Sequence, residues 1–310
     1  MCFYIKKWYL LFMLVYVTVL PAGGIFALDL TVLGGAGNTA FEDNRLSPLG
    51  DEGLRFTPRL YSQGSLLLEG NYSRVVGFRT GFERDPILKD RVIADIVFRG
   101  SFLKFELGPF VGILNSPEKP VKPGISAALR LEFPGVIFGS VQAASALGTA
   151  LSIPGDYAQE KGTIAFGFWV PHVLCIFSIN TKGFSRLGDQ RILIRDEQIR
   201  YQFTGNVFSW SVPYGARLDL GYQQLKRSYT SLAGDTKTDK LNSLYIGAEI
   251  VFTLRSVLRL FLGGEMPVYS WGTKPLTGPE RRTRLFQVHG GFTWTLPARS
   301  RRQAAGSFYP

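Results

Sequence analysis

Cysteine and histidine are scarce in this chain of 310 residues, with two of each. Cys2 lies in the amino-terminal segment discussed below, so Cys175 alone remains after it and an internal disulfide is excluded there. Catalytic triads rely on a histidine, and transition-metal sites usually draw on several histidine or cysteine ligands. With His172 and His289 as the whole supply of imidazole, the sequence predicts no catalytic site, no metal site and no cofactor.

Long hydrophobic runs are also missing beyond residue 27. A membrane-spanning helix needs about 20 consecutive apolar residues, and no later segment approaches that length. A multi-pass helical membrane protein is therefore excluded, whereas a protein that crosses a membrane as strands is not. Charged residues make up 19% of the chain, below the roughly 25% of soluble domains. The 35 glycines and an aromatic content of 14% also favour a membrane barrel.

The amino terminus has the three regions of a secretory signal peptide. Lys6 and Lys7 precede an apolar stretch at 8–20, which is followed by a short segment ending at Ala27. The apolar stretch has thirteen residues, fewer than the about 20 that a spanning helix needs. We therefore expect cleavage after Ala27 rather than a retained membrane anchor, and assign residues 1–27 to a signal peptide.

Positive charge exceeds negative charge. The formal net charge of +11 falls to +9 when Lys6 and Lys7 are removed. Much of the excess lies in two arginine-rich segments, at 281–284 and 299–302. Because a secreted chain seldom meets nucleic acid and this excess is local, we expect no nucleic-acid partner.

From residue 28 onward the main signal is period-two alternation in segments of about ten residues, typical of strands with one face toward lipid and one toward a lumen. In the clearest segment, 242–254, the even positions from Leu244 to Leu254 are all apolar. Its odd positions include Ser243 and Glu249. One face of such a strand is apolar and the other is polar.

Fourteen segments carry this pattern, and an even number is expected of bacterial barrels. The sequence therefore predicts an all-β fold, a transmembrane antiparallel up-and-down β-barrel over residues 28–296. Twelve or sixteen strands remain open, because 172–183 alternates poorly and Pro213 falls inside one segment. The expected strands are 28–39, 58–69, 72–83, 91–99, 101–113, 124–133, 136–147, 161–170, 172–183, 196–205, 207–223, 241–254, 257–268 and 284–296.

The connections between these segments alternate in length, as short periplasmic turns and longer outer loops do in such barrels. Tight turns are expected near Gly70, Gly100, Pro134, Pro171, Asn206 and Arg255. Longer outer stretches are expected at 40–57, 84–90, 114–123, 148–160, 184–195, 224–240 and 269–283. A soluble sandwich has no reason to sort its loops in this way.

Charged side chains fall on the polar face of the predicted strands. A basic residue at the bilayer midplane of a barrel costs roughly 2–4 kcal/mol, so we expect these side chains to face the lumen. Two interpretations stay open: charged rings that line a water-filled channel and bias which solutes pass, or ion pairs that close the barrel. The predicted pore-lining residues are Arg79, Glu83, Asp95, Arg99, Lys104, Glu106, Arg130, Glu132, Arg217, Asp219, Glu249, Arg259, Glu265 and His289, with Arg91 and Arg200 on the same face.

Signatures of an enzyme are not found. His289 is expected in the lumen, and no serine stands within a few residues of it on the same strand face. The glycines at 34–37 are not followed by the Gly-Lys-Ser/Thr of a phosphate-binding loop. We therefore predict that the protein is not an enzyme.

On this alternation, strand count and loop pattern, the chain resembles bacterial outer-membrane β-barrel proteins, and in strand count the fourteen-stranded monomeric porins. The resemblance is architectural and covers residues 28–296. It implies passive diffusion of small hydrophilic solutes, without a cofactor, in the outer membrane. The implied partners are outer-membrane lipid, small solutes and the outer-membrane assembly machinery, and the oligomeric state is left open. Residues 297–310 are expected to form a periplasmic tail.

Two alternatives remain. The segment 34–41 is loosely similar to the glycine-rich opening of the hatch in fatty-acid transport barrels, although it lacks their Asn-Pro-Ala motif. This similarity implies a transporter of fatty acids or other hydrophobic compounds. The third hypothesis is a closed barrel that acts as a surface adhesin, with the loops 40–57, 224–240 and 269–283 as its binding surfaces.

Overall fold

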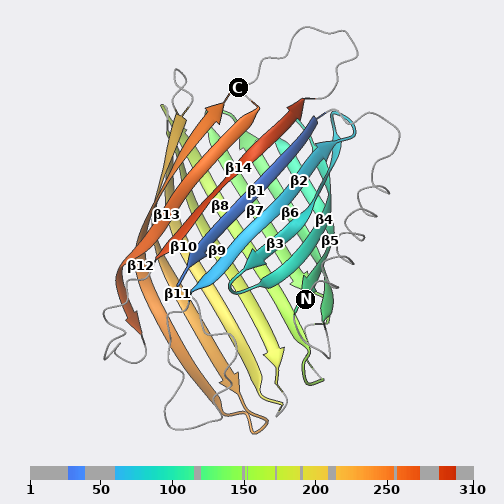
Figure 1. The fold of residues 1–310 in the computed structure, drawn as a ribbon, viewed down its shortest axis with the longest axis vertical. Helices are drawn as coiled ribbons and strands as arrows, with labels where there is room; N and C mark the ends of the chain where they lie inside the picture. The colour runs from blue at the N-terminus through green and yellow to red at the C-terminus, as the bar shows by residue number, and fades with distance from the viewer. Residues whose placement is uncertain are drawn as a thin grey trace.

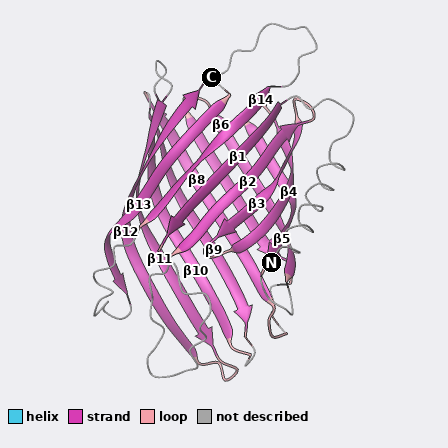
Figure 2. Ribbon diagram, in the orientation of Figure 1, coloured by secondary structure: helices cyan, strands magenta, loops and turns pink. Residues whose placement is uncertain are grey.

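The computed structural model contains strands and no helix among the residues that it describes (Figure 2). Within that part of the chain, no helix is both long and apolar enough to cross a membrane. The expected signal peptide, apart from Ala27, and the expected tail after Pro297 lie outside the described residues. The structure describes residues 27–38, 60–114, 120–148, 151, 153–171, 173–188, 191–208, 214–254, 257–272 and 286–297.

Fourteen strands form one closed antiparallel barrel, in which each strand pairs with its neighbours in the sequence and β14 closes on β1 (Figure 1). The closing pair runs in continuous register from Ala27 opposite Pro297 to Gly37 opposite Gln287. The predicted fold class and the count of fourteen are confirmed. The strands are β1 (Ala27–Gly37), β2 (Tyr61–Asn71), β3 (Val76–Asp85), β4 (Lys89–Arg99), β5 (Leu103–Ile113), β6 (Val121–Phe133), β7 (Ile137–Ala146), β8 (Tyr157–Val170), β9 (Val173–Leu187), β10 (Leu193–Phe208), β11 (Tyr214–Thr230), β12 (Thr236–Leu254), β13 (Leu258–Gly272) and β14 (Gln287–Pro297).

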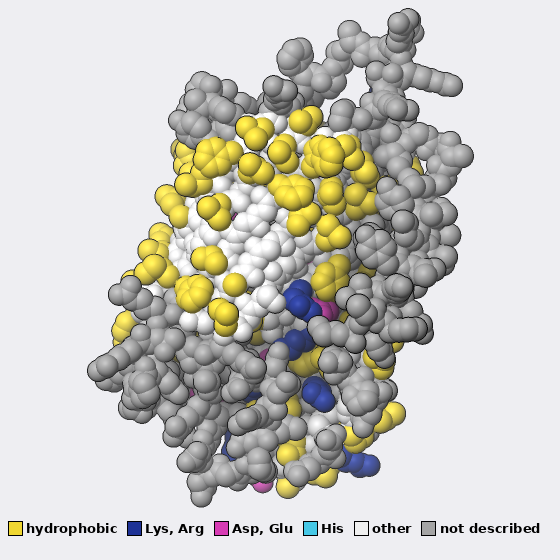
Figure 3. Space-filling model, viewed as in Figure 1, with side chains coloured by type: hydrophobic (Ala, Val, Ile, Leu, Met, Phe, Trp, Pro, Cys, Tyr) yellow, Lys and Arg dark blue, Asp and Glu magenta, His cyan; other side chains and the backbone are white. Residues whose placement is uncertain are grey.

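The outer surface of the barrel is apolar because one side chain in two points away from the lumen. On β12, Leu244 and Ile250 are 47% and 51% exposed, whereas Ser243 and Tyr245, on either side of Leu244, are buried. On the face seen in Figure 3, hydrophobic side chains spread over the upper wall, and Lys and Arg side chains gather in its lower half. The ten steps from Leu244 to Leu254 span about 33 Å along the strand, or about 25 Å of height at a tilt of about 40°. That height matches the hydrocarbon layer.

Aromatic side chains on the outside mark one edge of this apolar belt. Tyr201, Tyr222 and Leu244 occupy one register row, and the ring centroids of Tyr201 and Tyr222 are 6.1 Å apart. The indole of Trp271 lies 5.9 Å from Tyr222 and 5.5 Å from Tyr269. Rings with an apolar body and a polar tip suit the headgroup level of a membrane.

Above this row the outer surface becomes polar. Glu160, Glu197 and Lys226 lie in one row, and Lys226 Nζ is 2.8 Å from a Glu197 carboxylate oxygen. Arg195 Nε is 2.7 Å from the other Glu197 oxygen. Ion pairs on the outer surface need water around them, so strands β8, β10 and β11 continue past the membrane at this end.

The two ends of the barrel have connections of different kinds, as predicted. At one end, called here the tight-turn end, most connections are two to four residues long, such as 100–102 and 171–172. The long connections lie at the other end, called the long-loop end. There, however, β3 and β4 are joined only by residues 86–88, and β9 to β12 extend beyond β1 to β4 (Figure 1). The expected outer loops 84–90, 184–195 and 224–240 are therefore mostly strand, which removes most of 224–240 as an adhesin loop.

Two further expectations are corrected. Asn206 is not a turn, because β10 continues to Phe208 and Asn206 pairs with Arg217 on β11. Strand β11 begins at Tyr214, so Pro213 does not interrupt it and lies outside the described residues. Pro267 lies within β13, where the register with β12 shifts by one residue; a bulge there accommodates the missing backbone donor.

Candidate functional site

Behind the apolar belt, charged residues lie on the inner wall of the barrel, on the face of each strand opposite the apolar surface. The structure places the fourteen residues predicted from sequence on this inner face. Those on β3 to β6 are Arg79, Glu83, Asp95, Arg99, Lys104, Glu106, Arg130 and Glu132, and those on β11 to β14 are Arg217, Asp219, Glu249, Arg259, Glu265 and His289. The two sets lie on opposite sides of the barrel.

A ladder of ion pairs covers the wall formed by β2 to β5. Arg99 and Lys104 both bind the Glu69 carboxylate, Lys104 at 2.9 Å. Lys104 Nζ also lies 2.8 Å from Glu106, whose other oxygen is 2.9 Å from Arg79. Each carboxylate thus has a cation on an adjacent or nearby strand, which lowers the cost of its partial burial.

A second polar network covers the wall formed by β10 to β14. Asp219 accepts hydrogen bonds from Arg217 Nε at 3.0 Å and from Gln202 Nε2 at 2.7 Å. His289 Nε2 is 2.9 Å from a carboxylate oxygen of Glu249. Because that ring nitrogen is already paired, His289 fits a structural polar contact in the wall.

Arg200 and Glu265 join β10 to β13 on the same side of the barrel. The Arg200 guanidinium also lies 4.1 Å from the centre of the Tyr245 ring, a cation–π contact. These pairs link strands at most three places apart in the barrel order. They therefore run along the wall rather than across the lumen.

The β3–β4 turn is the exception, because it reaches across the lumen. Asp85, the last residue of β3, lies 2.5 Å from Lys182 Nζ on β9. This ion pair joins strands six places apart in the barrel order, whereas the pairs described above join strands at most three places apart. On β8, the Gln159 amide donates a hydrogen bond to the carbonyl of Leu88 in the same turn. Contacts with two strands of the opposite wall hold the turn inside the barrel.

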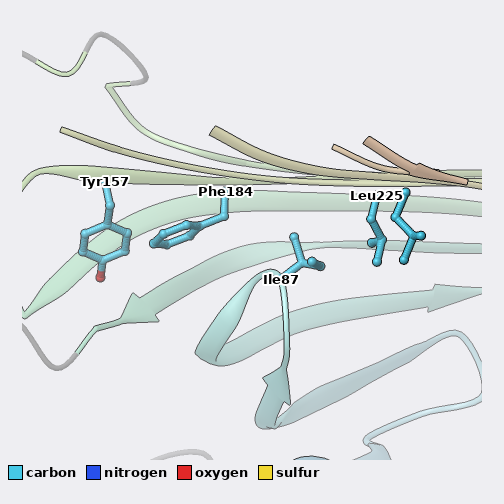
Figure 4. Packing of buried hydrophobic residues seen from close by; sticks show 5 residues of the cluster. Ile87, Tyr157, Phe184 and Leu225 are labelled. Atoms are coloured by element: carbon cyan, nitrogen blue, oxygen red, sulfur yellow. The ribbon is translucent and has the colours of Figure 1, made fainter. Parts of the chain in front are cut away.

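An apolar cluster lies where the turn meets that wall. Ile87 is 2% exposed and packs in one cluster with Tyr157, Phe184, Leu225 and Leu241, from β8, β9, β11 and β12. Figure 4 shows Ile87 at the tip of the turn, pointing toward the wall that carries the labelled Tyr157, Phe184 and Leu225. Near the long-loop end, apolar contacts thus bridge the lumen.

A second apolar cluster is built around Ile93 on β4 and Phe110 on β5, whose side chains lie on the inner face of the barrel. It contains Ile93, Phe110, Ala144, Ala146 and Ala158. Phe110 leans over Gly124 on β6, where an added Cβ would come within 2.2 Å of the ring. The glycine makes room for an aromatic side chain inside the barrel.

Metal ligands do not gather in the described part of the chain, where no group of three or more His, Cys, Asp or Glu side chains could hold a metal ion. His172 lies outside the described residues.

No family model and no curated protein matches this chain. Among solved structures, an outer membrane channel from Pseudomonas putida F1 aligns with a TM-score of 0.47 and 8% identity, over 90% of this chain and 97% of that one. In-vitro folded OmpT, an outer membrane protein of Vibrio cholerae, aligns with a TM-score of 0.41 and 10% identity, over 90% and 99% of the two chains. A complex of Salmonella typhi OmpF with daunomycin gives 0.37 and 9%, over 88% and 98%.

The fold is a closed antiparallel β-barrel of fourteen strands with an apolar outer surface. Likeness of this extent concerns the fold, and it indicates neither the solute nor the activity.

Several inner-wall residues were missed by sequence reasoning. Glu69 shares its face with Leu67, so alternation on β2 does not separate a polar side from an apolar one. Asp85 was assigned to the outer loop 84–90, and Lys182 was placed in the expected strand 172–183 but was not among the predicted pore-lining residues. Ile87 gave no signal, because an apolar residue in a short turn does not indicate on which side of the wall the turn lies.

Proposed function

We propose that this protein is a channel of the bacterial outer membrane through which small hydrophilic solutes diffuse passively, after removal of the signal peptide. The observation that supports this proposal best is the direction of the ion pairs. They follow the wall, and the β3–β4 turn is the described segment that bridges the lumen. A barrel closed by ion pairs would need such pairs between opposite walls at several heights.

The physical reason is that a charge satisfied by its wall neighbours does not need a partner in the lumen. Arg79 and Lys104 are 21% and 26% exposed in their side chains while paired with Glu106. They keep part of their surface open to the lumen and bias the passage of charged solutes. Because cations and anions alternate on the wall, we expect weak rather than strict ion selectivity.

The partners in this proposal follow from the apolar outer surface of the barrel. The apolar belt contacts outer-membrane lipid, and the assembly machinery of that membrane inserts the barrel. No cofactor and no nucleic acid takes part in this proposal.

Single-channel recording tests the proposal. The mature chain is refolded in detergent, checked for the heat-modifiable mobility of a folded barrel, and added to a planar bilayer. We expect discrete conductance steps with a small reversal potential across a salt gradient. A matched control replaces Lys226, on the outer surface of β11, by Gln and should leave the reversal potential unchanged. A folded chain that never conducts, either natively or with the turn loosened by Asp85→Ala and Ile87→Ala, would overturn it.

A further inference from the structure

The β3–β4 turn presents two chemically different groups side by side to the opposite wall. The Asp85 carboxylate contacts the Lys182 ammonium at 2.5 Å. Two residues later, the Ile87 side chain enters the apolar cluster of Tyr157, Phe184 and their neighbours. The turn thus presents a carboxylate and a nearby apolar side chain to the same part of the opposite wall.

The opposite wall supplies a cation for the carboxylate of the turn and an apolar surface for its isoleucine. Lys182 and Phe184 lie two residues apart on β9, so both side chains point to the same inner face. Tyr157 lies beside Phe184, with ring centroids 6.0 Å apart. Leu225 and Leu241 are buried on the strands beyond. Together these five side chains form what we call the recess: a cation at the edge of an apolar floor.

The turn keeps its shape through its own contacts. The second Asp85 oxygen accepts hydrogen bonds from the backbone amides of Ile87 and Leu88, at 2.8 and 3.0 Å. Lys89 donates to the carbonyl of Pro86 at 3.0 Å. Lys89 also has a positive φ of 62°, uncommon for a residue with a side chain and unfavourable in energy. A turn that is internally hydrogen-bonded can leave the wall as a unit.

Resting on the channel function proposed above, we propose that the recess is a binding site for short apolar carboxylates, and that such a solute displaces the turn. The carboxylate of the solute replaces that of Asp85 on Lys182, and its alkyl group replaces Ile87 among Phe184, Leu225 and Leu241. Gln159, released from Leu88, offers its amide to the same solute. Binding frees the lumen and opens the channel to the solute that it carries.

Hexanoate is the probe, because it combines one carboxylate with a short alkyl chain. Its binding to the refolded full barrel is measured by isothermal titration calorimetry. Acetate lacks the chain and hexylammonium reverses the charge, so neither should compete with hexanoate. In the Ile87→Ala barrel, where the turn no longer competes strongly for the recess, Lys182→Met should weaken hexanoate binding by about tenfold, the effect of losing one charge-assisted contact. Lys182→Arg keeps the charge and should retain binding. Lys226→Met, outside the barrel, is the matched control and should change nothing.

The direction in which Ile87→Ala changes the affinity for hexanoate tests the competition between the turn and the solute. Because the turn competes for the recess, Ile87→Ala raises the fraction of free recess and should tighten hexanoate binding. Partitioning of hexanoate into the detergent micelle should be the same for Ile87→Ala and Lys182→Met, so it cannot produce these differences. The proposal is overturned if hexylammonium competes equally, if Lys182→Met leaves the affinity unchanged, if Ile87→Ala weakens binding, or if hexadecanoate binds in preference to hexanoate. A barrel that conducts but gives one of these results keeps the channel function and loses the carboxylate site, whereas a barrel that never conducts loses the channel function.

Discussion

Replacing Ile87 by Ala should open the channel for a larger fraction of the time. The side chain is 2% exposed in the cluster that holds the β3–β4 turn against β8, β9, β11 and β12. The substitution removes three carbon atoms, and each buried CH₂ contributes about 0.8 kcal/mol. The docked turn therefore loses about 2.4 kcal/mol relative to the released turn, which corresponds to a roughly 60-fold shift of the equilibrium.

The assay is the open probability of single channels in a planar bilayer, recorded for the native chain and for Ile87→Ala. The matched control is Ile93→Ala, which removes the same atoms from a buried inner-wall position on β4 that is not part of the turn. We expect the open probability to rise with Ile87→Ala and to stay near the native value with Ile93→Ala. Equal effects of the two substitutions, or no effect of Ile87→Ala in a folded barrel, would refute the role of the turn.

Three further predictions follow from the same structure. Asp85→Lys and Lys182→Asp should each raise the open probability by several-fold, because each leaves two like charges facing each other. The double exchange should lower it again in part, since it restores the ion pair but not the hydrogen bonds that Asp85 accepts within the turn. Single variants without effect would show that the ion pair does not hold the turn. Leu262 has a side chain that is 70% exposed on the lipid face. Its replacement by Arg should lower the free energy of unfolding from lipid vesicles, measured by urea titration, by about 2–4 kcal/mol. A stability equal to the native value would contradict the assigned membrane face. Arg217→Gln with Arg259→Gln should shift the reversal potential toward cation preference, because two positive charges leave the inner wall, and an unchanged potential would place these residues away from the conducting path.

The strand pattern was predictable where one face of a strand meets lipid and the other meets a polar lumen. On β12, alternation between Leu244 and Leu254 follows from lipid on one side and a polar lumen on the other. Beyond the membrane that requirement ends. Lys226 and Lys240 pair in the register of β11 and β12, outside the apolar belt. The strands continue there with polar residues on both faces, so their outer ends were read as loops.

The candidate site was predictable in composition but not in connectivity. Charges such as Arg79 and Glu106 were assigned to the inner face, because facing lipid would be costly. The pairing of Arg79 with Glu106, and of Arg99 and Lys104 with Glu69, depends on barrel tilt and on rotamers, which a single strand does not specify. The contact between Asp85 and Lys182 joins residues 97 positions apart. It exists because a three-residue turn bends inward, and no local pattern distinguishes inward from outward bending.

Single-channel recording of the native chain beside the Asp85→Ala/Ile87→Ala variant tests the central claim most directly. We predict discrete, weakly selective openings in both, brief in the native chain and long in the variant. Two folded, heat-modifiable barrels that both remain silent would contradict the account of this protein as a channel.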